Sequence, residues 1–92
     1  MLQTVSITVK GKVQGVFFRQ STREKALGLG ITGQVRNERD GSVHIIATGS
    51  QEQLDQLAAW CRTGPPRAVV TDVHVKSLDT KNFNGFTIDS RH

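Results

Sequence analysis

Apolar and polar residues alternate along the first part of the chain. From about Thr4 to Val13, valine or isoleucine occupies every second position except Gly11, and mostly serine, threonine and lysine lie between them. A period of two residues is typical of a strand with one buried face and one solvent-facing face. The pattern therefore predicts a β-strand whose buried face carries Val5, Ile7, Val9 and Val13.

A helical pattern follows this strand, and we expect the helix to start between Phe18 and Ser21. Residues at helical spacing form its inner stripe: Phe18, Thr22, Ala26 and Leu29. Ser21 and Glu24 have the spacing of a capping box, and Gly30 is a typical C-terminal stop.

Two further strands are predicted at Ile31–Asn37 and Ser42–Thr48. The segment Arg39-Asp40-Gly41 separates them, and an Asp-Gly pair between two apolar runs indicates a hairpin. In the later strand, Val43, Ile45 and Ala47 are expected to face inward.

A second helix is expected to open at Ser50, because Gln53 again has capping-box spacing. Its apolar stripe is Leu54, Leu57, Ala58 and Cys61, and Gly64-Pro65-Pro66 ends it. A fourth strand is predicted at Val69–Leu78. The polar segment 79–85 then leads to a short strand at Phe86–Ile88.

The order βαββαβ, with a short extra strand, predicts an α+β ferredoxin-like sandwich: an antiparallel sheet with two helices on one face. The first helix crosses between the first two strands, so these strands are parallel and end at the same edge of the sheet. Asn37 ends the second of them and shares parity with Ile31 and Val35. Its side chain is therefore expected on the helix side of that edge.

The composition indicates the class of protein, but it says less about the molecules that the protein binds. At 92 residues the chain is expected to form a single domain, 1–92. A net charge of +4 favours anionic partners, but solubility alone explains it equally well. No apolar run approaches the roughly 20 residues of a membrane span, the N-terminus does not read as a signal peptide, and Cys61 is the only cysteine. These features predict a cytoplasmic protein with no membrane association, and we expect a monomer.

The segment from Gly11 to Arg19 carries the strongest chemical signal. A strand, a glycine-containing turn and a helix N-terminus direct backbone N–H groups and a positive dipole end toward one point. Arg19 at the helix start adds a guanidinium that can bind two phosphate oxygens at once. The spacing is neither that of a P-loop nor that of a dinucleotide fingerprint. It predicts an anion site, most simply for phosphate, although a lone arginine at a helix start is more often only solvated.

Two stretches of the chain resemble the signatures of the acylphosphatases. The first is Val9-Lys10-Gly11-Lys12-Val13-Gln14-Gly15-Val16-Phe17-Phe18-Arg19. The second is Gly33-x-Val35-Arg36-Asn37-x-x-x-Gly41-x-Val43, closing at Gly49. The element order also matches that family's ferredoxin-like fold. One departure is Gln34, where the family usually has an aromatic residue.

The resemblance implies metal-independent hydrolysis of acyl phosphates to carboxylate and phosphate, with no cofactor and no nucleic-acid partner. Arg19 would bind the phosphate and Asn37 would orient the attacking water. The backbone cradle would come from Gln14, Gly15, Val16, Phe17 and Phe18. Inorganic phosphate or sulfate is expected to occupy the same site.

The main alternative is a non-catalytic phosphate-binding or RNA-binding module of the same fold. RNA recognition on such a sheet needs aromatic residues on the open face of its central strands, where this sequence has Ser6, Thr8, Lys10, His44 and Ile46. A metal site is not expected, because His44, His74 and His92 lack ligand spacing and Cys61 belongs to a core stripe.

Overall fold

The structure of this chain is a computed structural model that describes residues 1–89. These residues form five strands and two helices: β1 (Gln3–Lys12), α1 (Phe18–Leu29), β2 (Thr32–Asn37), β3 (Val43–Gly49), α2 (Gln51–Cys61), β4 (Val69–Leu78) and β5 (Phe86–Asp89). The predicted order of elements is confirmed, and no strand boundary is displaced by more than one residue.

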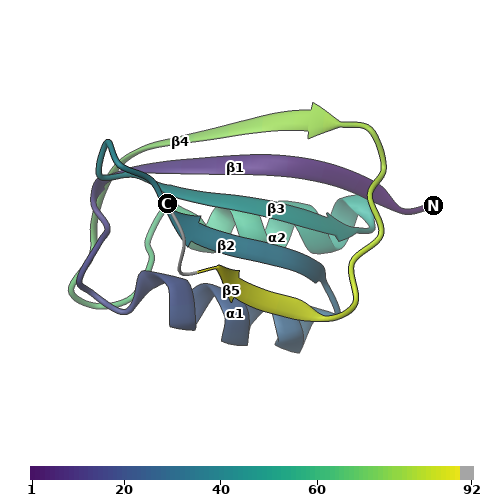
Figure 1. Cartoon of the computed structure of the whole chain (residues 1–92), viewed down its shortest axis with the longest axis horizontal. Helices are drawn as coiled ribbons and strands as arrows, with labels where there is room; N and C mark the ends of the chain where they lie inside the picture. Colours follow the sequence, from purple (N-terminus) through teal and green to yellow (C-terminus); the bar gives the residue numbers. More distant parts are fainter. Residues whose placement is uncertain (90–92) are drawn as a thin grey trace.

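The five strands form one sheet in the order β4-β1-β3-β2-β5 (Figure 1). The β1–β3, β1–β4 and β2–β3 pairs are antiparallel, as predicted. β5 pairs parallel with β2, so the short extra strand makes the sheet mixed. Because β1 and β2 are both antiparallel to β3, they are parallel to each other and end at the same edge. Figure 1 shows the segment after β1 and the β2–β3 hairpin together at that end of the sheet.

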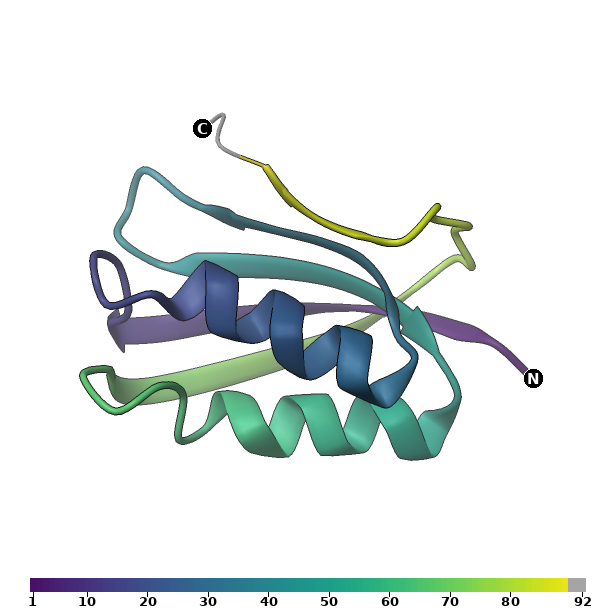
Figure 2. The same cartoon turned by 90° about the horizontal axis from the view of Figure 1, so that it is seen from below.

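Both helices cover the same face of the sheet (Figure 2). α1 packs on β2 and β5, and α2 packs on β1, β3 and β4. The core lies between these two layers. Its largest fully buried side chains include Phe18, Ile7, Ile31, Ile45 and Leu57. The rings of Phe18 and Trp60 meet at a centroid distance of 5.5 Å and join the two helices. The architecture is thus the predicted ferredoxin-like α+β sandwich.

Two predicted helix ends are confirmed in detail. The Ser50 hydroxyl accepts from Gln53 N at 3.2 Å, and Gln53 Oε1 accepts from Ser50 N at 2.8 Å, which completes the capping box of α2. Gly30 ends α1 in the left-handed conformation with φ 77°. The next N–H, of Ile31, then donates to Ala26 O at 2.9 Å. These bonds satisfy backbone groups that helix ends otherwise leave without partners.

The predicted cap at the start of α1 is wrong. The N-cap is Phe17, in the left-handed conformation and without a side-chain cap. Ser21 already lies in the helix, where its N–H donates to Phe17 O at 3.0 Å. A capping serine needs a non-helical backbone at the helix entry. Ser21 and Glu24 therefore cannot form the predicted box.

The alternation in β4 predicted a strand correctly, but most of its valines are not buried. Val73 is 8% exposed, whereas Val69 and Val75 are 57% and 50% exposed. β4 is an edge strand that pairs only with β1. Its outer side therefore has no neighbouring strand to cover it.

Gly33 allows β2 to lie between two neighbours at close range. Its φ of 150° is rarely adopted by residues with a side chain, and a Cβ there would overlap the carbonyl oxygen of Ile46. Its N–H donates to Gly85 O at 3.0 Å, just before β5. Gly33 of β2 thus contacts β3 on one side and the residue that precedes β5 on the other.

Candidate active site

The segment between β1 and α1 turns sharply at two residues. Gly15 has φ 74°, and Phe17 has φ 64° and ψ 25°. Left-handed backbone costs a residue with a side chain roughly 1–2 kcal/mol, so surrounding structure must impose it at Phe17. Bends that include left-handed residues direct neighbouring N–H groups toward a common point.

The backbone N–H groups of residues 14–18 make no hydrogen bond inside the described part of the chain. The first turn of α1 contains no acidic residue to offset the positive end of the helix dipole. The segment therefore has the properties of an anion-binding cradle.

Arg19 is the second residue of α1 and is partly buried. Its guanidinium makes no hydrogen bond or ion pair with any other residue in the range 1–89. A partly buried arginine without a carboxylate partner leaves its donors free for an anionic ligand.

Asn37 ends β2 on the helix side of the sheet, as its parity predicted. Its Oδ1 atom is buried and has no hydrogen-bond partner among the residues that the structure describes. Burying an acceptor without a partner costs about 1–3 kcal/mol. Such an atom is a natural place for a ligand or a water to donate a hydrogen bond.

A cavity of about 320 Å³ brings these groups together. It is lined by Val13, Gly15, Phe17, Phe18, Arg19, Gln20, Asn37 and Ile88. Two of the predicted site residues, Gln14 and Val16, do not line it. Val16 is buried in the core, and the side chain of Gln14 points to the β2–β3 hairpin.

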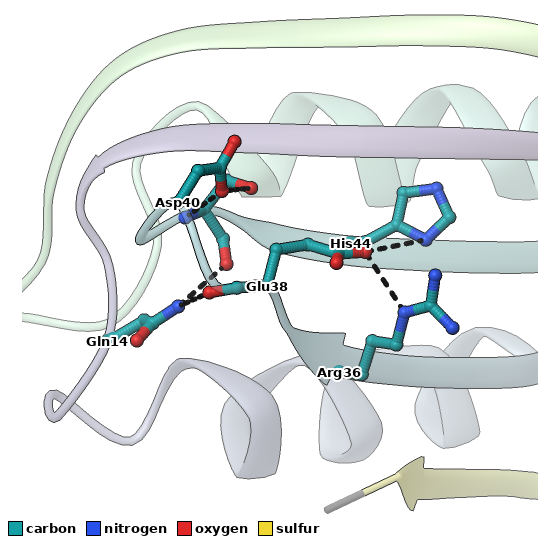
Figure 3. Close-up of polar contacts among 6 residues, drawn as sticks. Gln14, Arg36, Glu38, Asp40 and His44 are labelled. Atoms are coloured by element: carbon teal, nitrogen blue, oxygen red, sulfur yellow. Dashed lines mark hydrogen bonds and ion pairs between the residues drawn. The ribbon is translucent and has the colours of Figure 1, made fainter. Parts of the chain in front are cut away.

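The side chain of Gln14 has a contact that sequence reasoning did not predict. Its Nε2 donates to Glu38 O at 2.7 Å and to Ser42 O at 3.0 Å (Figure 3). Both carbonyls belong to the hairpin that follows Asn37. This amide therefore fixes the cradle segment against the segment that positions Asn37.

The hairpin has its own supporting bonds. Glu38 N donates to Ser42 O at 2.8 Å, and Asp40 Oδ1 accepts from Ser42 N at 2.9 Å and from Ser42 Oγ at 2.6 Å. These bonds from Ser42 lower the pKa of the exposed Asp40 carboxyl. Hydrogen bonds within the hairpin thus stabilise the turn, in addition to the two bonds from Gln14.

A polar cluster lies on the open face of the sheet beside this hairpin (Figure 3). Arg36 Nε donates to Glu38 Oε1 at 3.0 Å, and His44 Nδ1 is 3.8 Å from the same oxygen. Burial lowers the pKa of His44, and the Arg36 charge lowers it further, against the opposing effect of Glu38. The lowered pKa favours the neutral ring of His44 at pH values above its ordinary range, where the His44–Glu38 approach is not an ion pair.

Candidate metal ligands do not cluster within residues 1–89. No three histidine, cysteine, aspartate or glutamate side chains in this range could hold a metal ion together. His74 bonds Asp72 at 2.7 Å, and His92 lies outside the described residues. Cys61 is buried in the core, as predicted, and burial raises the pKa of its thiol to about 12. Neither helix of the described chain is long and apolar enough to cross a membrane.

Comparison with known proteins gives a consistent result. A sequence model of the acylphosphatase family matches residues 5–88. An acylphosphatase of Pelotomaculum thermopropionicum is 48% identical over 83 residues, which cover 89% of this chain and 90% of that protein. An acylphosphatase of Marinobacter nauticus is 51% identical over 81 residues, covering 87% of this chain and 88% of that protein.

Solved structures agree with the sequence comparisons. The structure of an acylphosphatase from Coxiella burnetii superposes with a TM-score of 0.93 at 38% identity, covering 96% of this chain and 93% of that one. The acylphosphatase of Bacillus subtilis gives a TM-score of 0.91 at 33% identity, covering 97% and 99%.

Proposed function

Since the chain belongs to the acylphosphatase family, a family of hydrolases that act on acyl phosphates, we propose that its cavity at the end of β1 and β2 is the catalytic site. The observation that carries this proposal is the meeting of two unsatisfied groups around one cavity. These are the guanidinium of Arg19 and the buried Oδ1 of Asn37, neither of which has a partner among residues 1–89.

The cradle would hold the phosphoryl group of the substrate. Phosphoryl transfer is accelerated mainly by positioning and by stabilising charge on the equatorial oxygens. The segment 14–18, of which Gly15, Phe17 and Phe18 line the cavity, would supply N–H donors for those oxygens, and the Arg19 guanidinium would supply donors and positive charge. This set of donors does not require a metal ion, so we propose that hydrolysis is metal-independent.

Asn37 would orient the water that attacks phosphorus. Its Oδ1 accepts a hydrogen bond from that water, which places the water oxygen for attack in line with the bond to the acyl oxygen. As the new P–O bond forms, the bond to the acyl oxygen breaks and the carboxylate leaves with the electron pair. The second proton of the water passes to a phosphoryl oxygen of the substrate, which gives carboxylate and dihydrogen phosphate.

This route explains why the cavity needs no acid or base of its own. A carboxylate is a good leaving group and departs without protonation by the enzyme. None of the described residues that line the cavity is an aspartate, glutamate or histidine. A dependence of kcat on an enzyme group that titrates near neutral pH would contradict substrate-assisted proton transfer.

The alternative RNA-binding function has less support. The central strands β1 and β3 present half-buried Ser6, Thr8, His44 and Ile46 on the open face of the sheet. Stacking of unpaired bases requires aromatic side chains at such positions. The sheet offers no such platform there.

The test is release of phosphate from acetyl phosphate and from benzoyl phosphate with EDTA present. We expect turnover well above spontaneous hydrolysis, and we expect Arg19→Ala to lower kcat/KM by about 10²–10³-fold. Lys25→Ala is the matched control, because it removes an exposed charge from the same helix. Turnover at the spontaneous rate, or turnover that requires an added divalent cation, would overturn the proposal.

A further inference from the structure

The cavity is larger than a phosphoryl group needs. Its volume is about 320 Å³. A phosphate has five heavy atoms, and if each needs the roughly 10–15 Å³ of such volume that holds one water, the phosphate accounts for about 75 Å³ at most. More than half of the cavity therefore remains for the rest of the substrate.

The lining residues outside the polar cradle are mostly apolar. Phe17 is 71% exposed and Ile88 is 39% exposed, and both line the cavity. Val13 and Phe18, also lining residues, are 1% and 2% exposed. Two accessible and two buried apolar side chains thus line the cavity.

The backbone holds Phe17 at this place. Phe17 is the only residue other than glycine with positive φ in the described chain, and it forms the N-cap of α1. A left-handed cap would be less strained as glycine or asparagine. A large aromatic residue, exposed and in a strained conformation beside a phosphate cradle, is better explained by ligand contact than by folding.

Ile88 comes from a separate element. β5 pairs parallel with β2, which places Ile88 beside Val35, and Asn37 lies two residues further along β2. Residues paired in this way share a face of the sheet, so Ile88 is on the same side as Asn37. The parallel pairing of β5 was not predicted from the sequence. Through Ile88, β5 contributes an apolar wall to the cavity.

We propose that Phe17 and Ile88 form a subsite for the acyl group, so that the enzyme favours acyl phosphates with an apolar or aromatic acyl group. This inference rests on the proposed function. The acyl group of a bound substrate is covalently adjacent to the phosphoryl group, whose oxygens engage the guanidinium and the N–H groups. The remaining accessible side chains of the lining are Phe17, Ile88 and Gln20, and the first two offer an apolar surface. Contact there removes apolar area of the substrate from water and contributes to transition-state binding.

The experiment measures kcat/KM for benzoyl phosphate and for acetyl phosphate in the same preparation. The informative quantity is the ratio of the two values, because differences in intrinsic reactivity cancel when variants are compared with the wild type. We test Phe17→Asn, which tolerates the left-handed backbone, and Ile88→Thr, which keeps a β-branched residue in β5. We expect each to lower the benzoyl-to-acetyl ratio about tenfold, the usual effect of losing an apolar contact.

Leu27→Ala is the control, because Leu27 is 47% exposed on α1 and does not line the cavity. It should leave the ratio unchanged. Equal losses on both substrates, or an unchanged ratio in both subsite variants, would overturn the acyl subsite while leaving the proposed hydrolysis intact. Absence of turnover of either substrate by the wild type would instead overturn the proposed function itself. Far-ultraviolet circular dichroism and thermal unfolding show whether each variant is folded.

Discussion

The side-chain amide of Gln14 donates to the main-chain carbonyl of Glu38 over 2.7 Å, although the two residues are 24 positions apart. The same amide also donates to Ser42 O at 3.0 Å. The pair of bonds joins the cradle before α1 to the hairpin after Asn37 (Figure 3). One neutral side chain therefore links the two halves of the site, in addition to the sheet that carries both β1 and β2.

Gln14→Ala should lower kcat more than it weakens phosphate binding. The cradle N–H groups remain, whereas Asn37 loses a fixed position relative to them, and small displacements of catalytic groups can cost about 10²-fold. We expect kcat to fall about 10–100-fold and the inhibition constant of inorganic phosphate to change by less than about threefold, which is under 1 kcal/mol.

Gln14→Glu tests the same contact with almost no change in size. A carboxylate cannot donate to the two carbonyls, so its effect should match that of Gln14→Ala. Gln56→Ala, at an exposed position of α2, is the control. A Glu variant with wild-type kcat would show that the tether has no role in the reaction.

Asn37→Ala should separate stability from activity. It removes a buried acceptor that has no partner in the described chain, so the free energy of unfolding should stay level or rise by about 1 kcal/mol. It also removes the group that orients water, so kcat should fall by about 10²-fold or more. Urea unfolding and steady-state kinetics check the two parts. A variant that retains full kcat would eliminate the water-orienting role.

Gly33→Ala should destabilise the protein strongly. The new methyl group would overlap the carbonyl oxygen of Ile46, and φ at this position is 150°. We expect a loss of about 3 kcal/mol or more in the free energy of unfolding.

The matched control for Gly33→Ala is Gly28→Ala in α1. A Cβ at Gly28 meets no atom within 4 Å, and its φ is not positive. Alanine there should stabilise the protein by about 0.5–1 kcal/mol, because it favours the helix. Chemical denaturation of both variants measures the contrast. Similar effects of both substitutions would contradict the close approach of β2 and β3 at Gly33.

His44 should make stability depend on pH just below neutrality. Burial and Arg36 lower its pKa in the folded protein below the ordinary value of 6.5. As the pH falls through 6.5, the unfolded chain therefore binds a proton that the folded chain does not, and the free energy of unfolding decreases. The contribution of His44 to the free energy of unfolding is fully present above pH 6.5 and is lost on acidification.

Urea unfolding of the wild type and of His44→Gln between pH 7.5 and pH 5.5 tests this effect. The variant should show a flatter dependence, because it lacks the titrating ring. Equal slopes for both proteins would contradict the lowered pKa of His44.

The contrast between the two helix starts shows how far the sequence predicted the fold. Ser50-x-x-Gln53 and Ser21-x-x-Glu24 have the same spacing, but only Ser50 has the extended backbone that a serine cap requires. At α1 the turn through Gly15 and Phe17 starts the helix at Phe18, before Ser21. The conformation of a preceding loop depends on tertiary contacts, which residue spacing does not encode.

The same limit applies to the site. Strand parity and the crossover between β1 and β2 predicted that Asn37 would lie at the edge carrying the cradle, and both Asn37 and Arg19 line one cavity. The side-chain bonds of Gln14 and the wall formed by Ile88 were not predicted. Each depends on which segment lies opposite in space, a relationship that alternation and spacing do not contain.

The place of β5 affects when the cavity is completed during synthesis. β5 follows the other described strands in the sequence, yet it lies beside β2 and carries Ile88 to the cavity. A ribosome makes the chain from its N-terminus, so Arg19 and Asn37 leave the exit tunnel well before Phe86–Asp89. A nascent chain therefore exposes both polar groups before the Ile88 wall is present. Ile88 is therefore the last of the described lining residues to be synthesised.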